Sequence, residues 1–319
     1  MILLSIYPKE KKLVYALVFI LSLMLAACAS PTISSPTLLP IPTATALPPA
    51  TPTLSPHYPG AGEYPNSIIS GDMERLFLVH VPEGYDPRIP GALVFNFHGA
   101  GASVEQQKLL TAMTVHADQR GYIVVFPQAI GYPTYWDTSS PNSYDVLFIV
   151  DLLDHLKTHL NIDPKRVYAT GFSNGGSMVE WLACTQAEHF AAVAPVAGAY
   201  AYESPCEPSR PVPIIAFHGT LDYNVPYWGG YDLFAAIPIW AEYWAKRNSC
   251  NLEPIIGYER EGASAQFWGK CDQGADVALY TAKRLGHTWP GSMYGSAHQY
   301  LDATNVIWGF FESHPMPDQ

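Results

Sequence analysis

The chain has 319 residues, of which 48% are apolar and 14% charged, and its formal net charge is −11. Without a basic stripe to meet phosphate groups, this composition argues against a nucleic-acid partner. The apolar content is ample for the core of one large domain, and we find no internal repeat.

The first 28 residues are typical of an export signal. Three lysines precede an apolar run over residues 13–27, which is short for a membrane span. Leu25-Ala26-Ala27-Cys28 resembles the lipobox of bacterial lipoproteins, in which the cysteine is lipidated after cleavage. The sequence therefore predicts a lipid anchor on Cys28 at the bacterial cell surface, and the alternative is ordinary secretion with an incidental cysteine.

Residues 29–59 are almost entirely Pro, Thr, Ser, Ala and Leu, with no charge and no aromatic residue before His57. Such a segment cannot bury a core, so we expect an extended spacer between the anchor and a folded domain over residues 60–319. Its threonines and serines are candidates for glycosylation.

Strands and helices alternate along the domain. Strands are predicted over residues 75–81, 93–97, 122–126, 191–196, 214–217 and 277–282, with a further strand leading into Gly171. Helices are predicted over residues 104–120, 145–160, 233–247 and 302–312. This order predicts an α/β fold with a mainly parallel sheet covered by helices on both faces. Ligands of such sheets bind at the carboxyl ends of the strands.

The predicted strand over residues 93–97 leads into His98-Gly99-Ala100-Gly101. In acyl transfer the tetrahedral intermediate carries an oxyanion, which backbone N–H groups stabilise. We expect Ala100 or Gly101, together with Asn174, to supply these donors. We expect His98 to orient the loop rather than act as a base.

Ser173 is the candidate nucleophile, because Gly171-Phe172-Ser173-Asn174-Gly175 joins an apolar strand to helical sequence. A serine hydroxyl is a poor nucleophile unless a tight turn presents it to a base and to backbone donors. The glycines at both ends of the motif leave room for that turn. The motif alone also occurs in plain glycine-rich loops, so the strand and helix around it matter more than the pattern.

The acid and the base follow at two later strand ends. Asp222, in His218-Gly219-Thr220-Leu221-Asp222, is expected to orient a catalytic imidazole, although aspartate in a turn is also a common cap. His287 follows the strand over residues 277–282 and is the expected general base. His298 is the nearest competitor, but it follows a loop of small residues. The order Ser, Asp, His is that of the α/β-hydrolases.

Four cysteines remain beyond Cys28, and in an exported protein an even count favours disulfides. Of three possible pairings we favour Cys184 with Cys206 and Cys250 with Cys271, because each closes a short loop beside a predicted element. A zinc site is the alternative, but no close Cys-x-x-Cys spacing supports it.

Together these segments resemble the secreted esterase family that groups polyhydroxybutyrate depolymerases with the feruloyl and acetylxylan esterases of carbohydrate esterase family 1. The resemblance covers residues 71–311 and includes Gly286-His287-Thr288-Trp289-Pro290 and the motifs quoted above. It implies an α/β-hydrolase fold, a triad of Ser173, Asp222 and His287, no cofactor, and ester hydrolysis through an acyl-enzyme. Where members commonly carry an Asp-Asp pair, this chain has Tyr144-Asp145, which leaves the triad intact.

Aromatic residues after the predicted strands suggest flat walls near the nucleophile, suited to a phenolic acyl group or a sugar ring. The candidate substrate-binding residues are Tyr135, Trp136, Trp228 and Trp289. The sequence thus predicts a monomeric serine esterase acting on feruloyl or acetyl esters of plant polysaccharide. The alternatives are cleavage of polyhydroxybutyrate oligomers, a serine peptidase, and an inactive hydrolase fold that only binds a polymer.

Overall fold

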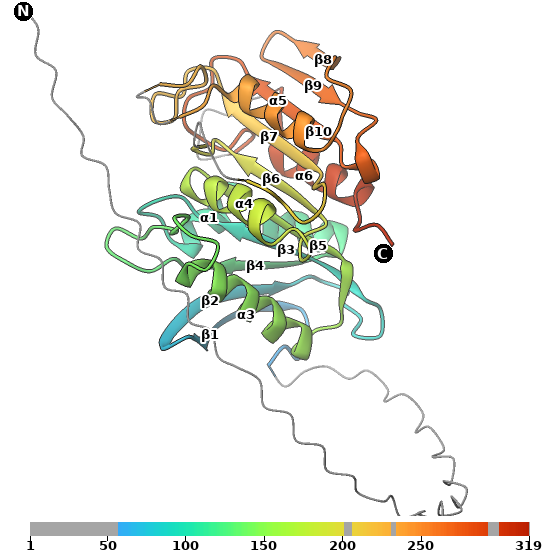
Figure 1. The fold of residues 1–319 in the computed structure, drawn as a ribbon. Helices are drawn as coiled ribbons and strands as arrows, with labels where there is room; N and C mark the ends of the chain where they lie inside the picture. Colours follow the sequence, from blue (N-terminus) through green and yellow to red (C-terminus); the bar gives the residue numbers. More distant parts are fainter. Residues whose placement is uncertain (1–56, 201–205, 231–233, 293–299, 319) are drawn as a thin grey trace, which may run out of the picture. The chain divides into compact units, whose positions relative to one another are not determined.

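One continuous sheet of ten strands forms the centre of the described chain in this computed structural model, which describes residues 57–200, 206–230, 234–292 and 300–318. The strands are β1 (Gly62–Ser70), β2 (Met73–Val81), β3 (Gly91–Phe97), β4 (Ile123–Pro127), β5 (Ile162–Phe172), β6 (Ala192–Val196), β7 (Ile214–Gly219), β8 (Ile255–Arg260), β9 (Ala263–Trp268) and β10 (Val277–Ala282). Their spatial order is β1-β2-β4-β3-β5-β6-β7-β10-β9-β8 (Figure 1).

The six inner strands, from β4 to β10 in the spatial order, are parallel to one another. The two outer strands at each end of the sheet pair antiparallel. Parallel neighbours require crossover connections, which the helices provide. All carboxyl ends of the inner strands therefore meet at one edge, and the predicted mainly parallel sheet is confirmed.

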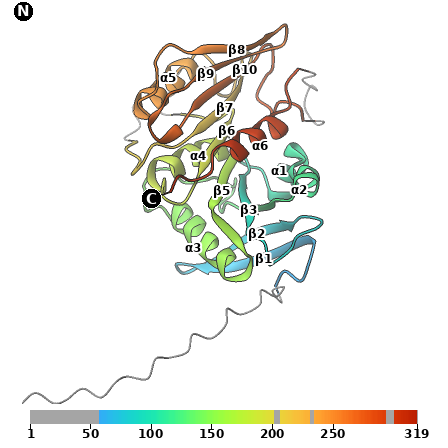
Figure 2. The same ribbon diagram turned by 90° about the vertical axis from the view of Figure 1, so that its right-hand side faces the viewer.

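Helices cover both faces of the sheet (Figure 2). They are α1 (Val104–Thr111), α2 (Met113–Arg120), α3 (Tyr144–His159), α4 (Asn174–Thr185), α5 (Ile237–Arg247) and α6 (Ala303–Ser313), with a 3₁₀ turn at Asp272–Gly274. One core cluster packs α3, α4 and α5 against one face, through residues such as Leu152, Leu182 and Trp244. A second cluster packs α2 and α6 against the other, through residues such as Ala117 and Trp308.

Three predicted boundaries differ from the structure. The helix expected over residues 233–247 begins at Ile237. The helix expected over residues 104–120 is divided at Ala112, which adopts φ 49° and ψ 27° and donates its N–H to Lys108. This left-handed cap separates α1 from α2. Tyr58, assigned from sequence to the spacer, is fully buried in the core and packs edge-on against Tyr64, with ring centroids 5.5 Å apart. The fold therefore includes at least this part of the predicted spacer.

Two disulfides join Cys184 to Cys206 and Cys250 to Cys271, as the sequence predicted. The first ties the end of α4 to the segment before β7, and the second ties the end of α5 to the turn before β10. Both therefore fix helices to the half of the sheet that carries β7 and β10. No helix in the described ranges is both long and apolar enough to cross a membrane. Cys28 and residues 1–56 lie outside the described residues.

Candidate active site

Ser173 occupies a strained turn between β5 and α4. Its backbone adopts φ 57° and ψ −121°, a conformation that a non-glycine residue rarely holds. A Cβ added to Gly175 would lie 2.4 Å from the Phe97 carbonyl oxygen, and one added to Gly171 would lie 2.6 Å from that of Gly175. The two glycines therefore let β3, β5 and α4 approach closely at the turn, which leaves the Ser173 side chain at the edge of a cavity.

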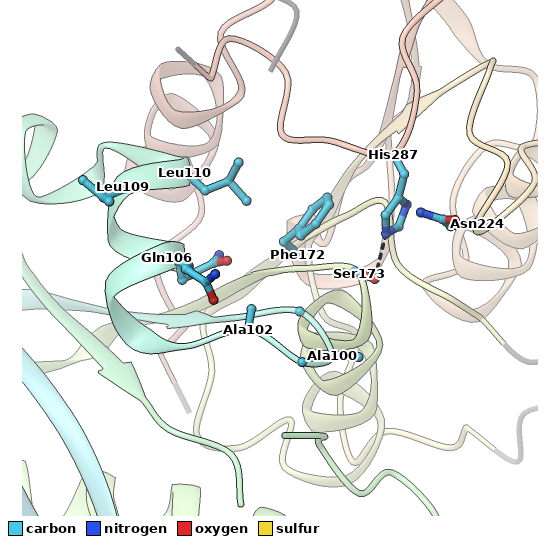
Figure 3. Close-up of a pocket in the computed structure, with 12 residues that line it drawn as sticks. Ala100, Ala102, Gln106, Leu109, Leu110, Phe172, Ser173, Asn224 and His287 are labelled. Carbon is cyan, nitrogen blue, oxygen red and sulfur yellow. Dashed lines mark hydrogen bonds between the residues drawn. The ribbon is translucent and has the colours of Figure 1, made fainter. Parts of the chain in front are cut away.

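Ser173, His287 and Asp222 form one continuous hydrogen-bonded chain. His287 Nε2 lies 2.8 Å from Ser173 Oγ, and His287 Nδ1 lies 2.7 Å from Asp222 Oδ2 (Figure 3 shows the first contact). Because an ionised carboxylate only accepts, Nδ1–H donates to Asp222 and Nε2 is left to accept the serine proton. The three residues follow β5, β7 and β10, so the parallel sheet brings together positions up to 114 residues apart.

Asp222 is held as a carboxylate. Burial alone would raise its pKa, but hydrogen bonds from His218, His287 and the Val225 N–H outweigh burial and hold the pKa well below its usual range. Its side chain is fully buried, whereas the His287 side chain is 13% exposed. The imidazole therefore meets a permanent negative charge on one side and the open cavity on the other.

Of the two candidate oxyanion donors in the loop after β3, Ala100 and Gly101, only one has an unoccupied N–H group. Gly101 donates its N–H to the Thr134 carbonyl at 2.7 Å, so this group is already occupied and the expectation for Gly101 is wrong. Within the described ranges, the N–H groups of Ala100 and Asn174 have no protein acceptor. These two N–H groups therefore remain as donors for a developing oxyanion beside Ser173.

His98 orients this loop, as expected from the sequence. Its Nε2 accepts the Ala129 N–H at 3.0 Å, so the proton lies on Nδ1, which donates to the Gly99 carbonyl at 2.8 Å. Burial lowers the pKa of His98, which keeps the ring neutral. His98 therefore fixes the backbone next to Ala100 and takes no part in the triad. His298, the competing base, lies outside the described residues.

Comparisons with known proteins agree with this geometry. Feruloyl esterase C of Emericella nidulans is 30% identical over 279 residues, which cover 85% of this chain and 97% of that protein. The chain belongs to the family of feruloyl esterase C. The resemblance to feruloyl and acetylxylan esterases that the motifs indicated is thereby confirmed.

Other members of this esterase family, and proteins with the same fold, match parts of the chain. Feruloyl esterase B of Piromyces equi is 31% identical over 229 residues; the match covers 67% of this chain, which spans 42% of that protein. A sequence profile of the prolyl oligopeptidase family matches residues 110–204. The structure of an acetyl xylan esterase from Aspergillus awamori superposes with a TM-score of 0.61 at 15% identity, over 79% of this chain and 99% of that one. The fold is thus that of the α/β-hydrolases.

The cavity of this feruloyl esterase relative has a volume of about 680 Å³. Ser173, His287 and the loop after β3 form part of its lining. The other lining residues are Phe172, Asn224 and four residues of α1, Gln106, Gln107, Leu109 and Leu110. Figure 3 shows Phe172 between the α1 side chains and His287, and its ring centroid lies 4.8 Å from that of His287.

The sequence analysis missed the α1 wall of the cavity, although a local signal was present. Ser103 and Gln106 form a capping box: the Ser103 N–H donates to Gln106 Oε1 at 2.9 Å, and Ser103 Oγ accepts the Gln106 N–H at 3.4 Å. Ser103 caps α1 only three residues after Ala100. The first turn of the helix therefore lies beside the loop after β3.

Two of the four predicted substrate-binding aromatics are buried, so their assignment is wrong. Trp136 is fully buried, donates from Nε1 to the His98 carbonyl, and exchanges backbone hydrogen bonds with the Asn174 side chain. Trp289 is 1% exposed and donates to Thr304 on α6. Both rings therefore pack inside the protein and do not line the cavity. Tyr135 and Trp228 are 54% and 74% exposed, but they do not line the cavity.

Proposed function

We propose that this protein is a serine carboxylesterase in which Ser173 is the nucleophile, His287 the general base and Asp222 the orienting acid. The observation that carries this proposal is the contact of Ser173 Oγ with His287 Nε2 at 2.8 Å beside two unoccupied N–H groups. Membership in the family of feruloyl esterase C supports ester hydrolysis over an inactive, polymer-binding fold. A complete triad supports the same choice.

The mechanism follows from these positions. Ser173 Oγ attacks the ester carbonyl while its proton passes to His287 Nε2, and Asp222 stabilises the imidazolium that forms. The carbonyl oxygen becomes an oxyanion, which the N–H groups of Ala100 and Asn174 stabilise. The imidazolium then protonates the leaving alcohol, and an acyl group remains on Ser173. Water, deprotonated by His287, releases the acid in the reverse sequence.

The substrate we propose is a feruloyl or acetyl ester of a plant polysaccharide. A cavity of about 680 Å³ with Phe172, Leu109 and Leu110 in its lining has room for a phenolic acyl group and offers it apolar contacts. Gln106 holds Ser103 through Oε1, so its Nε2 is a donor for a polar substituent. Two relatives are named feruloyl esterases, and one structure with this fold is an acetyl xylan esterase. Short hydroxyalkanoate oligomers are the alternative.

The exposed rings of Tyr135 and Trp228 suit the polysaccharide part of such a substrate. Tyr135 precedes Trp136, whose backbone is bound to Asn174, and Trp228 packs edge-on against Tyr227 with ring centroids 4.9 Å apart. Exposed aromatic rings present apolar faces on which sugar rings can stack. We expect them to contact the sugars and not the acyl group.

A substrate panel tests the proposal. We expect kcat/KM for methyl ferulate to exceed that for a 3-hydroxybutyrate trimer, with negligible hydrolysis of the matching ferulic amide. Ser173→Ala and His287→Ala should each abolish nearly all turnover, and the double variant should be no worse, because triad members act as a unit. Preference for the trimer would reverse the substrate assignment, and preference for the amide would identify a peptidase.

The anchor and the location are part of the same proposal. Two disulfides support export, because such bonds persist in oxidising compartments. The basic and apolar leader ending at Cys28 supports lipid attachment at the cell surface. We propose that a monomeric esterase domain is held there by the lipidated Cys28 through the proline-rich spacer.

A further inference from the structure

A second histidine contacts the acid of the proposed triad. His218 lies on β7, four residues before Asp222, and its side chain is 1% exposed. Its Nε2 lies 2.9 Å from the Val225 carbonyl oxygen and 3.2 Å from Asp222 Oδ2. A carbonyl oxygen only accepts, so Nε2 carries a hydrogen. This one N–H therefore donates to the Val225 carbonyl and to the Asp222 carboxylate together.

The other ring nitrogen indicates the protonation state of His218. Nδ1 is buried and has no hydrogen-bond partner within the described ranges. A cationic imidazole would place a second N–H there without an acceptor, which is costly in a buried site. His218 is therefore the neutral imidazole with its proton on Nε2.

The titratable groups that face His218 are Asp222, His287 and Tyr227. His287 approaches the same Asp222 oxygen from the loop after β10. The Tyr227 ring lies edge-on to His218 with centroids 6.1 Å apart, and its hydroxyl is bonded to Thr281 Oγ1 at 2.7 Å. None of the three places an acceptor at His218 Nδ1.

Asp222 accordingly accepts from four donors. The N–H groups of Asn224 and Val225 donate to Oδ1 at 3.0 and 2.8 Å, and the two imidazoles donate to Oδ2. We propose that His218 is a positioning residue, which holds Oδ2 toward His287 and draws charge from the oxygen that supports the catalytic imidazole. The proposal rests on the triad proposed above.

The direction of the effect follows from the shared oxygen. Without the His218 donor, Oδ2 carries more negative charge and stabilises the His287 imidazolium more strongly. A variant without this donor should therefore lose activity at a higher pH on acidification than the wild type does. Looser alignment of Asp222 lowers kcat, whereas KM is unaffected because His218 does not line the cavity.

The test compares His218→Phe with His218→Gln, by kcat and KM for methyl ferulate between pH 4.5 and 9. Phenylalanine keeps the ring without a donor, and glutamine restores an N–H. In the phenylalanine variant we expect kcat to fall roughly tenfold and the acid limb to rise by about half a pH unit, the effect of one hydrogen bond. The glutamine variant should return both toward wild type. Superimposable pH profiles in all three proteins would overturn the proposal.

A measurement on the wild-type protein covers the case in which His218→Phe does not fold. Nitrogen-15 spectra of histidine-labelled enzyme should show the His218 proton on Nε2. A His218 proton on Nδ1 would refute the assignment. Failure of the triad proposal is read separately, from full esterase activity in Ser173→Ala.

Discussion

Glu180 is a buried carboxyl group on α4, the helix that follows Ser173. It accepts hydrogen bonds from Nε1 of Trp240 and, at 3.4 Å, of Trp244 on α5. Burial raises its pKa from 4.5 to about 7, against the effect of these bonds. Between pH 4.5 and about 7, the folded protein therefore holds a proton on Glu180 that the unfolded chain has released.

We predict that this proton makes the protein less stable as pH rises. A raised carboxyl pKa contributes stability that is complete below the unfolded value and lost as pH passes through the folded value, so the window is pH 4.5 to 7. The loss amounts to about 3 kcal/mol. Glu180→Gln keeps an acceptor for Trp240 but does not ionise. Its free energy of unfolding relative to wild type should rise by about that amount between pH 4.5 and 8 in urea titrations; a constant difference would disprove the account.

For single residues, the sequence located Ser173, Asp222 and His287 more accurately than it located the side chains that line the cavity. Ser173, Asp222 and His287 each follow a predicted strand, and a parallel sheet brings such positions together whatever the loops do. Trp136 and Trp289 also lie in those loops, but the position of a ring above or below a loop depends on contacts such as Trp289 with Thr304. Those contacts join residues that no local pattern relates. The occupied N–H of Gly101 was hidden for the same reason.

The turn between β5 and α4 depends on Gly175 for space. An added Cβ would meet the backbone oxygens of Phe97 and His98 at 2.4 and 2.6 Å, and backbone cannot move aside as a side chain can. We predict that Gly175→Ala shifts Ser173 and lowers kcat/KM about 100-fold, as expected for a misplacement near 1 Å.

Gly309 on α6 provides the matched control. It is exposed, and an added Cβ there meets nothing within 4 Å. Gly309→Ala should leave kcat/KM unchanged and raise the free energy of unfolding by about 0.5–1 kcal/mol, because alanine loses less backbone entropy in a helix. Equal activity in the two alanine variants would contradict the close packing at the turn.

Among the elements, the six parallel strands and the antiparallel β2 were predicted, whereas the outer antiparallel strands β1, β8 and β9 were not. Buried strands such as β3 are short continuous apolar runs, which sequence patterns identify. β8 is mostly exposed, and its sequence Ile-Ile-Gly-Tyr-Glu-Arg does not alternate apolar with polar residues, so no strand pattern identifies it and its pairing with β9 is set by the sheet edge. The division at Ala112 was missed because alanine is a strong helix former and tertiary packing selects its left-handed conformation.

For the molecule as a whole, the two disulfides are predicted to be major stabilising links. Each joins residues 21 or 22 positions apart. In the chain-entropy account, a loop of this length contributes about 3 kcal/mol by restricting the unfolded chain. Replacing Cys184 and Cys206 together by serine should lower the urea midpoint accordingly while the triad remains active at low temperature. An unchanged midpoint would show that the link does not restrict the unfolded chain.

The proposed lipid anchor on Cys28 concerns how the whole domain is held. We predict that Cys28→Ser moves the protein from the membrane fraction to the soluble fraction without reducing kcat/KM on methyl ferulate. Cys28 precedes the first described residue by 29 positions and lies far from Ser173 in the sequence, so catalysis should not depend on the proposed attachment. Fractionation followed by an esterase assay checks this, and retention of the serine variant in the membrane fraction would contradict lipidation at Cys28.

The most direct measurement of the central claim is the acyl-enzyme itself. The protein is mixed with excess nitrophenyl ferulate, quenched in acid during turnover and analysed by intact and peptide mass spectrometry. We predict one added feruloyl group on the peptide that contains Ser173, and none in Ser173→Ala. A feruloyl group on another residue, or undiminished turnover in Ser173→Ala, would contradict the assignment of Ser173 as the nucleophile.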